Sequence, residues 1–316
     1  MGIREVSPDV FCLPTDYPQV ADAPLFVYLI RGGQTALSDA ATSSTYDAVL
    51  RDAFSELSFT AADLDWLLLT HAHPDHTGAA KSLREAGSRL RVAAPLQAVA
   101  WTESFDRQWH EFWNAHPGVV DIAPHQEELS AMSGGDLTVD RILRDDELFD
   151  LGKRQLRVVQ TRGHTVGHCA YFDETNRVLF SGDVGLGRTT PSSSGKTNFL
   201  PLYVDVEDHV TGLQRLRDLP FEVMCPAHHE PVEREEGLAL IDEALEFVDE
   251  IDAIVLDALA RSGSSATLSH LSRTLGEHFG MVPSVWLHTA CVAHAHLQRA
   301  AGRGLVEPAW NTTAKR

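Results

Sequence analysis

A cluster of polar residues directly after an apolar run constrains this chain most. The run, residues 66–69, is typical of a buried strand, and His71, His73, Asp75 and His76 follow it closely. Neutral imidazole and carboxylate groups are the ligands that zinc and similar divalent ions prefer. Because the backbone can turn at a strand end, we expect the first two histidines to face one point and the other two side chains to face a neighbouring one. The sequence therefore predicts a metal site at the end of this strand.

Four further motifs accompany this H-x-H-x-D-H run. They are Leu37-Ser38-Asp39-Ala40, Gly163-His164-Thr165-Val166-Gly167-His168, Ser181-Gly182-Asp183 and Pro226-Ala227-His228. Together the five motifs resemble those of the metallo-β-lactamase superfamily, over roughly the first three-quarters of the chain. Alanine stands where the family has glycine at Ala41 and Ala227, which puts the local backbone shape in question but removes no ligand.

The resemblance implies an α/β fold in which two halves pack as a four-layer αββα sandwich, with the metals at one edge between the sheets. It also implies two divalent ions, most commonly Zn²⁺, with iron and manganese as alternatives. The implied ligands are His71, His73 and His164 for one ion, Asp75, His76 and His228 for the other, and Asp183 as the bridge. His168, four residues beyond His164, is expected to support the fold near the site without binding metal.

Asp39 has two possible roles. As a cap it would accept a hydrogen bond at the start of a helix near Ser43 or Ser44. As in the resembled family, it would instead orient a ligand histidine, the usual task of a carboxylate behind a metal site. We favour the second role.

Such a site predicts hydrolysis. The pKa of water falls from about 15.7 to near 7 on a suitable metal ion, which supplies hydroxide at neutral pH, and the same ions stabilise a developing oxyanion. We expect Asp75 and Asp183 to be the catalytic carboxylates. Within the superfamily, di-iron oxidases place glutamate where this chain has His73, and true β-lactamases usually lack the bridging aspartate. Thioesterases of the glyoxalase II type, lactonases, phosphodiesterases and nucleases retain it.

The charge of the chain narrows these classes. Lys and Arg number 26 against 45 Asp and Glu, a formal charge of −19, which disfavours nucleic acid and anionic membranes as partners. Our hypothesis is hydrolysis of a small-molecule thioester, ester or lactone with an apolar acyl or aryl part. The alternatives are a phosphodiesterase or nuclease of the same superfamily, and a non-enzymatic metal-binding regulatory module.

The remaining patterns place the other elements. Strands are expected at 10–13, 25–30, 35–37, 64–70, 89–94, 148–151, 156–160, 168–172, 178–180 and 221–225, and helices at 46–57, 77–83 and 206–216. Residues 185–201 are rich in Gly, Ser, Thr and Pro and are expected to form a loop. Within or just after this loop, Lys196 and Tyr203 are candidate substrate contacts.

Residues 98–144 form an aromatic-rich insertion. Its aromatic residues recur at helical spacing: Trp101, Phe105, Trp109, Phe112 and Trp113. This stripe either packs on the domain or on a second subunit, or it forms the wall of an apolar substrate pocket. The second interpretation makes Trp109 and Trp113 pocket residues.

The chain divides into a catalytic domain, 1–236, and a tail, 237–316. Apolar periodicity predicts tail helices at 238–259, 268–275 and 286–302. The tail resembles the small winged-helix-like tails of some superfamily hydrolases, and we expect it to serve packing, formation of a homodimer or closure of the cleft. The chain begins without an apolar signal segment, and its four cysteines lie far apart, so we expect a cytoplasmic protein without disulfides.

Overall fold

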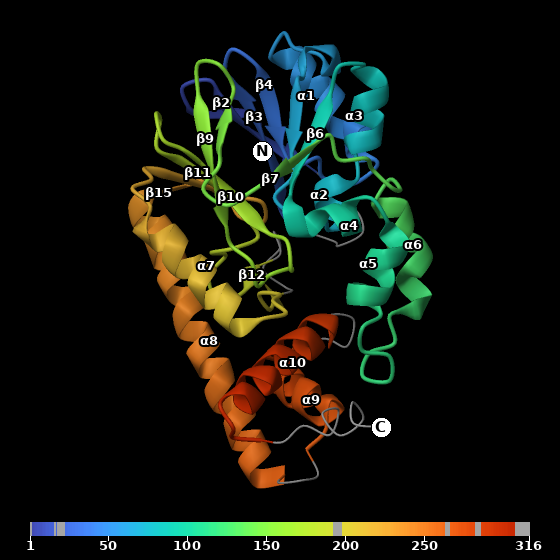
Figure 1. Cartoon of the computed structure of the whole chain (residues 1–316), viewed down its shortest axis with the longest axis vertical. Helices are drawn as coiled ribbons and strands as arrows, with labels where there is room; N and C mark the ends of the chain where they lie inside the picture. Colours follow the sequence, from blue (N-terminus) through green and yellow to red (C-terminus); the bar gives the residue numbers. More distant parts are fainter. Residues whose placement is uncertain are drawn as a thin grey trace.

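Two mixed β-sheets form the centre of the molecule (Figure 1). The structure is a computed structural model that describes residues 2–15, 17, 23–191, 198–262, 266–281 and 286–306. The first sheet has the order β1 (Arg4–Ser7), β2 (Val10–Thr15), β3 (Leu25–Arg31), β4 (Thr35–Ser38), β5 (Trp66–Leu68), β6 (Arg91–Pro95), β7 (Arg141–Leu143). The second has the order β15 (Val232–Glu233), β14 (Val223–Pro226), β11 (Val178–Gly182), β10 (Cys169–Asp173), β9 (Gln155–Gln160), β8 (Leu148–Asp150).

Strand β3 shows why the sheets stack. Tyr28 packs in the core between the sheets, where its ring centroid lies 5.6 Å from that of Phe180 on β11. The neighbouring Val27 and Leu29 face the opposite way, into a second core. A strand that is apolar on both faces is expected where both faces of its sheet are covered, because successive side chains point to opposite sides.

Helices cover the outer face of each sheet (Figure 1). On the first sheet, Phe54 of α1 (Arg51–Glu56) and Leu83 of α3 (Ala80–Ala86) complete the outer core. On the second, Leu213 of α7 (Val206–Asp218) and Ile241 of α8 (Arg234–Ser262) do the same. The layers therefore run helix, sheet, sheet, helix, and the predicted fold class is confirmed.

Three local expectations need correction. The helix expected at 46–57 begins with a widened turn, η1 (Tyr46–Leu50), before α1. The expected loop 185–201 contains a short pair of strands, β12 (Thr190–Pro191) and β13 (Asn198–Phe199). The range 98–144 also includes a strand of the first sheet, because β7 pairs in parallel with β6 at the edge of that sheet.

The rest of the insertion is a series of short helices: α4 (Val99–Thr102), α5 (Phe105–Gln108), the widened turn η4 (Trp109–Trp113) and α6 (Gln126–Met132). Trp101, Trp109 and Phe112 are buried, while Trp113 is half-buried. The aromatic stripe therefore packs mainly into the molecule.

The tail consists of helices in its described part, 234–262, 266–281 and 286–306. Beyond the first turns of α8, Ile251 and Val255 pack with α9 (Leu268–His278) and α10 (Trp286–Gly302) in a core that also includes Tyr203 and Val206. The expected boundary after residue 236 falls within the first turn of α8. No β-hairpin wing occurs in these described segments, and no helix among the described residues is long and apolar enough to cross a membrane.

Candidate metal centre

The motif residues meet at one edge of the two sheets. Asp39 follows β4 and His71 follows β5, and these strands run parallel, so both residues emerge at the same edge. In the second sheet Asp183 follows β11 and His228 follows β14, which are also parallel. His164 lies on the turn between β9 and β10. The packing of the sheets thus brings residues from five separate motifs to one place.

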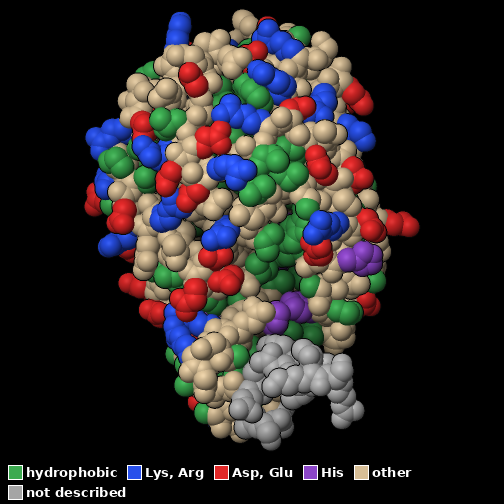
Figure 2. Space-filling model, in the orientation of Figure 1, with side chains coloured by type: hydrophobic (Ala, Val, Ile, Leu, Met, Phe, Trp, Pro, Cys, Tyr) green, Lys and Arg blue, Asp and Glu red, His purple; other side chains and the backbone are tan. Residues whose placement is uncertain are grey.

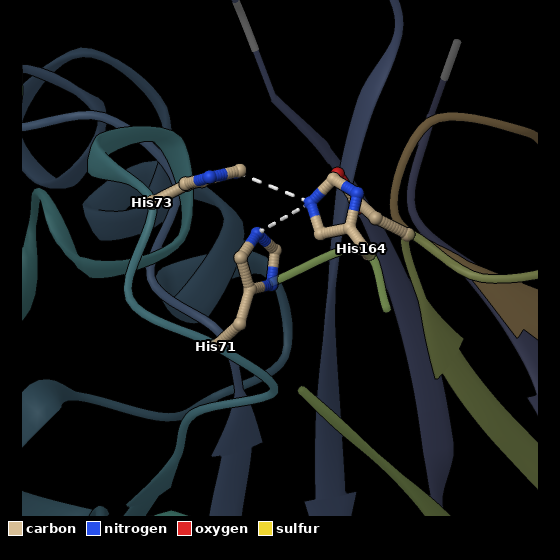
Figure 3. A group of neighbouring side chains, drawn as sticks. His71, His73 and His164 are labelled. Carbon is tan, nitrogen blue, oxygen red and sulfur yellow. Dashed lines mark hydrogen bonds and ion pairs between the residues drawn. The ribbon is translucent and has the colours of Figure 1, made fainter. Parts of the chain in front are cut away.

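The seven implied ligands form two groups, and within each group the ligand atoms lie within 4.8 Å of one another. The groups are His71, His73, His164 and Asp183, and Asp75, His76 and His228. In the first group the three imidazole rings converge (Figure 3), with His164 Nε2 at 3.2 Å from both His71 Nε2 and His73 Nδ1. Six of the seven side chains belong to buried residues, and Asp183 is half-buried.

Hydrogen bonds behind the rings determine which nitrogen carries the proton. His164 Nδ1 lies 2.7 Å from the carbonyl oxygen of Leu202, which can only accept, so Nε2 of the neutral ring has the lone pair. Thr70 Oγ1 donates its one hydrogen to Asp39 Oδ2 at 2.8 Å. The same hydroxyl oxygen therefore accepts from His71 Nδ1, at 3.0 Å. His71 also presents a lone pair on Nε2.

These assignments fit bound cations. The lone pairs of His71 and His164 face each other at 3.2 Å, which is repulsive unless a positive charge lies between them. A contact between the two groups repeats the conflict. His76 Nδ1 donates to Asp39 at 3.0 Å, so in the neutral ring the Nε2 lone pair faces Asp183 Oδ1 at 3.2 Å. Neither of these two atoms has a hydrogen-bond partner among the described residues. Imidazole and carboxylate donors in this arrangement fit two divalent ions.

The electrostatics of the site agree. Burial lowers the pKa of His71 well below its ordinary value, and the neighbouring histidines lower it further. Burial alone would raise the pKa of Asp183, but His76 and His228 outweigh it and hold that pKa well below its usual range. Burial also opposes a charged His228, yet the nearby carboxylates, Asp183 above all, raise the pKa of His228 to about 10. Metal ions would displace the protons of the second group and would replace their charge.

Asp39 holds His76, one of the implied ligands. Its Oδ1 accepts a hydrogen bond from the backbone N–H of Thr70 at 2.7 Å, and its Oδ2 accepts from the Thr70 hydroxyl and from His76 Nδ1. The helical turn that begins at Tyr46 has Thr45, not Asp39, at its N-cap position. The geometry is therefore that of a carboxylate behind an implied metal ligand. Thr70, whose hydroxyl connects Asp39 to His71, was not apparent from the sequence.

The two alanines that replace family glycines differ in conformation. Ala41 has φ +56°, in the left-handed region that costs a non-glycine residue about 1–2 kcal/mol. Its methyl group is fully buried in the outer core of the first sheet, which offsets about 0.8 kcal/mol. Ala227 is not among the residues with positive φ. Of these two alanines, only Ala41 therefore strains the backbone.

His168 supports the backbone of Asp183, the implied bridge. Its Nε2 accepts a hydrogen bond from the backbone N–H of Asp183 at 3.1 Å, so Nδ1 carries the proton and donates to Thr161 Oγ1 at 2.7 Å. Gly182 adopts φ +57°, and a Cβ there would lie 2.6 Å from His168 Nε2. This contact holds the backbone where Asp183 begins, without making His168 a ligand.

A cavity of about 120 Å³ opens over the two groups. Apart from the implied ligands, its walls are mostly apolar and include Trp113, Leu186, Leu200 and Leu202. Tyr17 and His288 add polar side chains to these walls. No Lys or Arg of the described segments is among the lining residues. The cavity is thus a small, mostly apolar pocket with implied metal ligands on one side.

The predicted pocket residues are placed unevenly. Trp113 lines the cavity, with its ring centroid 5.3 Å from that of His73. Trp109 is only 2% exposed and is not among the described residues that line the cavity. Tyr203 is also buried away from it, bonded to His296 at 2.9 Å. Those two placements correct the prediction, and Lys196 lies outside the described residues.

Sequence reasoning missed two groups that shape the site. Gln108 donates to the carbonyl of Ala72 at 2.6 Å and accepts from Trp113 Nε1 at 3.1 Å, which ties the insertion to the metal-binding loop. His288 comes from the tail, far from every motif, so no local pattern marks it. Gln108 follows the exposed Asp106 and Arg107 in α5, so its sequence neighbours do not reveal that it is buried.

Comparisons with known proteins agree with this geometry. A model of the metallo-β-lactamase superfamily matches residues 23–228. An acyl-coenzyme A thioesterase of Gallus gallus is 30% identical over 172 residues, which cover 50% of this chain and 54% of that protein. The chain thus spans about half the length of this relative. A hydroxyacylglutathione hydrolase of Rhodospirillum rubrum is 24% identical over 242 residues and 75% of each chain.

Solved structures share the fold. A metallo-β-lactamase family protein from Thermus thermophilus aligns with a TM-score of 0.71 at 22% identity, over 94% of this chain and 95% of that one. A β-lactamase domain protein from Burkholderia ambifaria aligns with a TM-score of 0.69 at 20% identity, over 96% and 90%. Because both alignments extend over nearly the whole chain, the shared fold includes the region of the tail.

Proposed function

Since the chain belongs to the metallo-β-lactamase superfamily, we propose that it is a metal-dependent hydrolase that acts on thioesters of small neutral acyl groups, with two zinc ions. One observation carries the proposal: a single carboxylate, Asp183, reaches both ligand groups. Its Oδ2 lies 3.5 Å from His164 Nε2 and 3.5 Å from His228 Nε2, and its Oδ1 lies 3.2 Å from His76 Nε2. Two ions bridged in this way would supply hydroxide at neutral pH and polarise the carbonyl under attack.

The residues of the chain prepare that chemistry. Asp39 and Thr70 hold His76 and His71 in the tautomers that present lone pairs to the centre. His168 holds the backbone of Asp183. Side chains that are fixed before the reaction lose no free energy to reorganisation as charge develops on the oxyanion.

The shape of the cavity supports an acyl substrate. Its volume of about 120 Å³ is near the roughly 150 Å³ of an apolar cavity that admits benzene, so a short or ring-sized acyl group fits. Trp113 and the leucine walls would bury that group. Two relatives are named for thioester hydrolysis, the thioesterase of Gallus gallus and the hydrolase of Rhodospirillum rubrum. A thiolate, with a parent pKa of about 8.5, also leaves more readily than an alkoxide does.

Charge counts against phosphodiesters. An anionic diester would find no Lys or Arg among the described lining residues, and the whole chain carries a formal charge of −19. Lys and Arg on the face in Figure 2 are interspersed with Asp and Glu, without the large basic patch that a nucleic-acid backbone requires. These features support a neutral substrate.

Metal analysis and a substrate panel test the proposal. We expect two equivalents of zinc per chain, with iron or manganese as the alternatives that elemental analysis distinguishes. The value of kcat/KM should be highest for acyl thioesters, lower for phenyl esters and lactones, and lowest for bis(p-nitrophenyl) phosphate. Asp75→Ala should abolish turnover, and Asp183→Ala should also weaken retention of the metal pair. Preference for the phosphodiester, or full activity of a metal-free preparation, would overturn the proposal.

A further inference from the structure

Helix α10 of the tail reaches the wall of the metal-site cavity. Leu287 and Cys291 pack in one apolar cluster with Ala72 of the metal-binding loop and Leu202. His288, between them in the sequence, lines the cavity together with Asp75, Asp183 and His228. The tail therefore contacts the site through side chains on one face of α10.

His288 holds a specific part of that wall. Its Nδ1 lies 2.8 Å from the carbonyl oxygen of Leu200, and because a carbonyl only accepts, the imidazole donates. Two residues later, the carbonyl oxygen of Leu202 accepts from Nδ1 of the metal ligand His164 at 2.7 Å. Two histidines, one from the tail and one from the metal site, are thus bonded to the two ends of the same three-residue segment.

The segment is suited to transmit position. Its middle residue is Pro201, whose ring fixes φ and so removes one of the backbone rotations between the two carbonyls. Leu200 is 1% exposed and Leu202 is 8% exposed, so neighbouring side chains confine both. Immediately beyond, the backbone N–H of Val204 donates to the carbonyl of Gly163, next to His164, at 2.7 Å. A shift at Leu200 would therefore displace the acceptor on which the orientation of His164 depends.

We propose that His288 is a positioning residue of the metal centre, which acts through the Leu200–Leu202 segment on the ligand His164 and makes the tail an integral part of the site. The relevance of His288 to catalysis rests on the proposed function. Its effect on metal binding does not. The inference predicts that loss of the His288 donor weakens one of the two metal sites selectively. Loss of an outer hydrogen-bonding partner costs about 10-fold to 100-fold in metal affinity, and an indirect partner belongs at the lower end, about 10-fold.

Zinc affinity of the full-length protein tests this. Apo-protein is titrated with Zn²⁺ against a chromophoric chelator for the wild type, His288→Ala, His288→Asn and His288→Gln. Asparagine places an amide N–H near the position of imidazole Nδ1, whereas glutamine places it one carbon farther along. We expect one of two zinc equivalents to bind about 10-fold more weakly in His288→Ala, Asn to restore most of the affinity and Gln to restore little.

His294→Ala is the matched control. His294 lies on the same helix and contacts His116 of the insertion, with ring centroids 4.7 Å apart, and it is not among the described residues that line the cavity. This variant should bind both zinc equivalents as the wild type does. Equal zinc affinities of the wild type and the three His288 variants would overturn the inference. An equal loss of zinc affinity in His294→Ala would also overturn it. If His288→Ala fails to fold, equal affinities of the Asn and Gln variants would overturn it.

The same titrations separate this inference from the proposed function. A wild type that binds two zinc ions but hydrolyses no thioester contradicts the proposed function, and the affinity differences among the His288 variants still decide the inference. A wild type that hydrolyses thioesters with no change of zinc affinity in His288→Ala and His288→Gln contradicts the inference alone.

Discussion

Replacing Asp39 by asparagine is the sharpest test of how the site is held. The carboxylate accepts three hydrogen bonds, from the backbone N–H of Thr70, from its hydroxyl and from His76 Nδ1. Asparagine has one acceptor oxygen and one NH₂ donor group in their place. If the oxygen stays with the backbone N–H of Thr70, the NH₂ group faces His76 Nδ1, and two donors then oppose each other. His76 relieves the conflict by moving its proton to Nε2, the nitrogen that the metal needs.

The magnitude follows from these contacts. Mutation of an outer-shell partner typically costs 10-fold to 100-fold in metal affinity, which is about 1.4–2.7 kcal/mol. The residue Asp39 is 3% exposed, so water cannot replace the lost acceptor, and the upper part of that range applies. We expect the larger loss in the group that contains His76, Asp75 and His228, because His76 loses its acceptor directly. His71 is affected only through the Thr70 hydroxyl, which loses the same carboxylate oxygen.

Competition with a chelator measures the effect, and Asp205→Asn provides the control. Asp205 is a genuine N-cap, whose Oδ1 accepts from the backbone N–H of Asp208 at 2.8 Å at the start of α7. Asparagine caps helices as well as aspartate does, so this variant should keep both its stability and its zinc affinity. If Asp39→Asn binds two zinc ions as tightly as Asp205→Asn does, the carboxylate does not orient His76, and the reasoning from tautomers is refuted.

Two further predictions separate packing from function. Trp113→Ala should lower the ratio of kcat/KM for benzoyl thioesters to kcat/KM for acetyl thioesters by roughly 10-fold or more, because about 1.5–3 kcal/mol of ring burial is lost. Trp109→Ala should leave this ratio unchanged and should instead lower the free energy of unfolding by about 3–5 kcal/mol. Equal ratios in both variants would contradict the cavity assignment. Burial lowers the pKa of His209 to about 3, so between pH 6.5 and 3 the unfolded chain takes up a proton that the folded chain does not, and stability falls as pH falls. When the pH is lowered from 7 to 5, the free energy of unfolding measured by urea titration should fall by about 2 kcal/mol less in His209→Phe than in the wild type. An equal fall in both proteins would exclude this residue as a source of acid sensitivity.

Most residues of the two candidate ligand groups could be picked out from the sequence because their signal is local. His71, His73, Asp75 and His76 lie within six consecutive positions that follow a strand, and the strand is recognisable from its apolar residues alone. The sheets follow for a similar reason, since runs such as β3 are apolar on both faces and require cover on both. Period and composition are properties of short segments, so they survive in a sequence without tertiary information.

The pocket was less predictable because its signal is not local. Helical spacing groups Trp109 with Trp113 but does not say which neighbours each will meet. The turn there is also widened, closed by a hydrogen bond from Asn114 N–H to the Trp109 carbonyl at 2.8 Å, which residue spacing does not reveal. Tyr203 follows a loop next to a ligand, yet it packs on the tail, and its ring stacks on His209 with centroids 4.5 Å apart. Proximity in sequence to a ligand was therefore a poor guide.

Ligands and walls come from different parts of the chain, and this division bears on specificity. The ligands emerge from strand ends that the packing of two sheets determines, so the reaction class depends on the common core of the fold. The walls come from the insertion, through Trp113, from the segment before α7, through Leu200 and Leu202, and from the tail, through His288. These segments can change without disturbing the sheets. His288 donates to the Leu200 carbonyl, and the Leu202 carbonyl of the same segment accepts from His164. We therefore expect substitutions in this part of the cavity wall to alter metal binding as well as substrate choice.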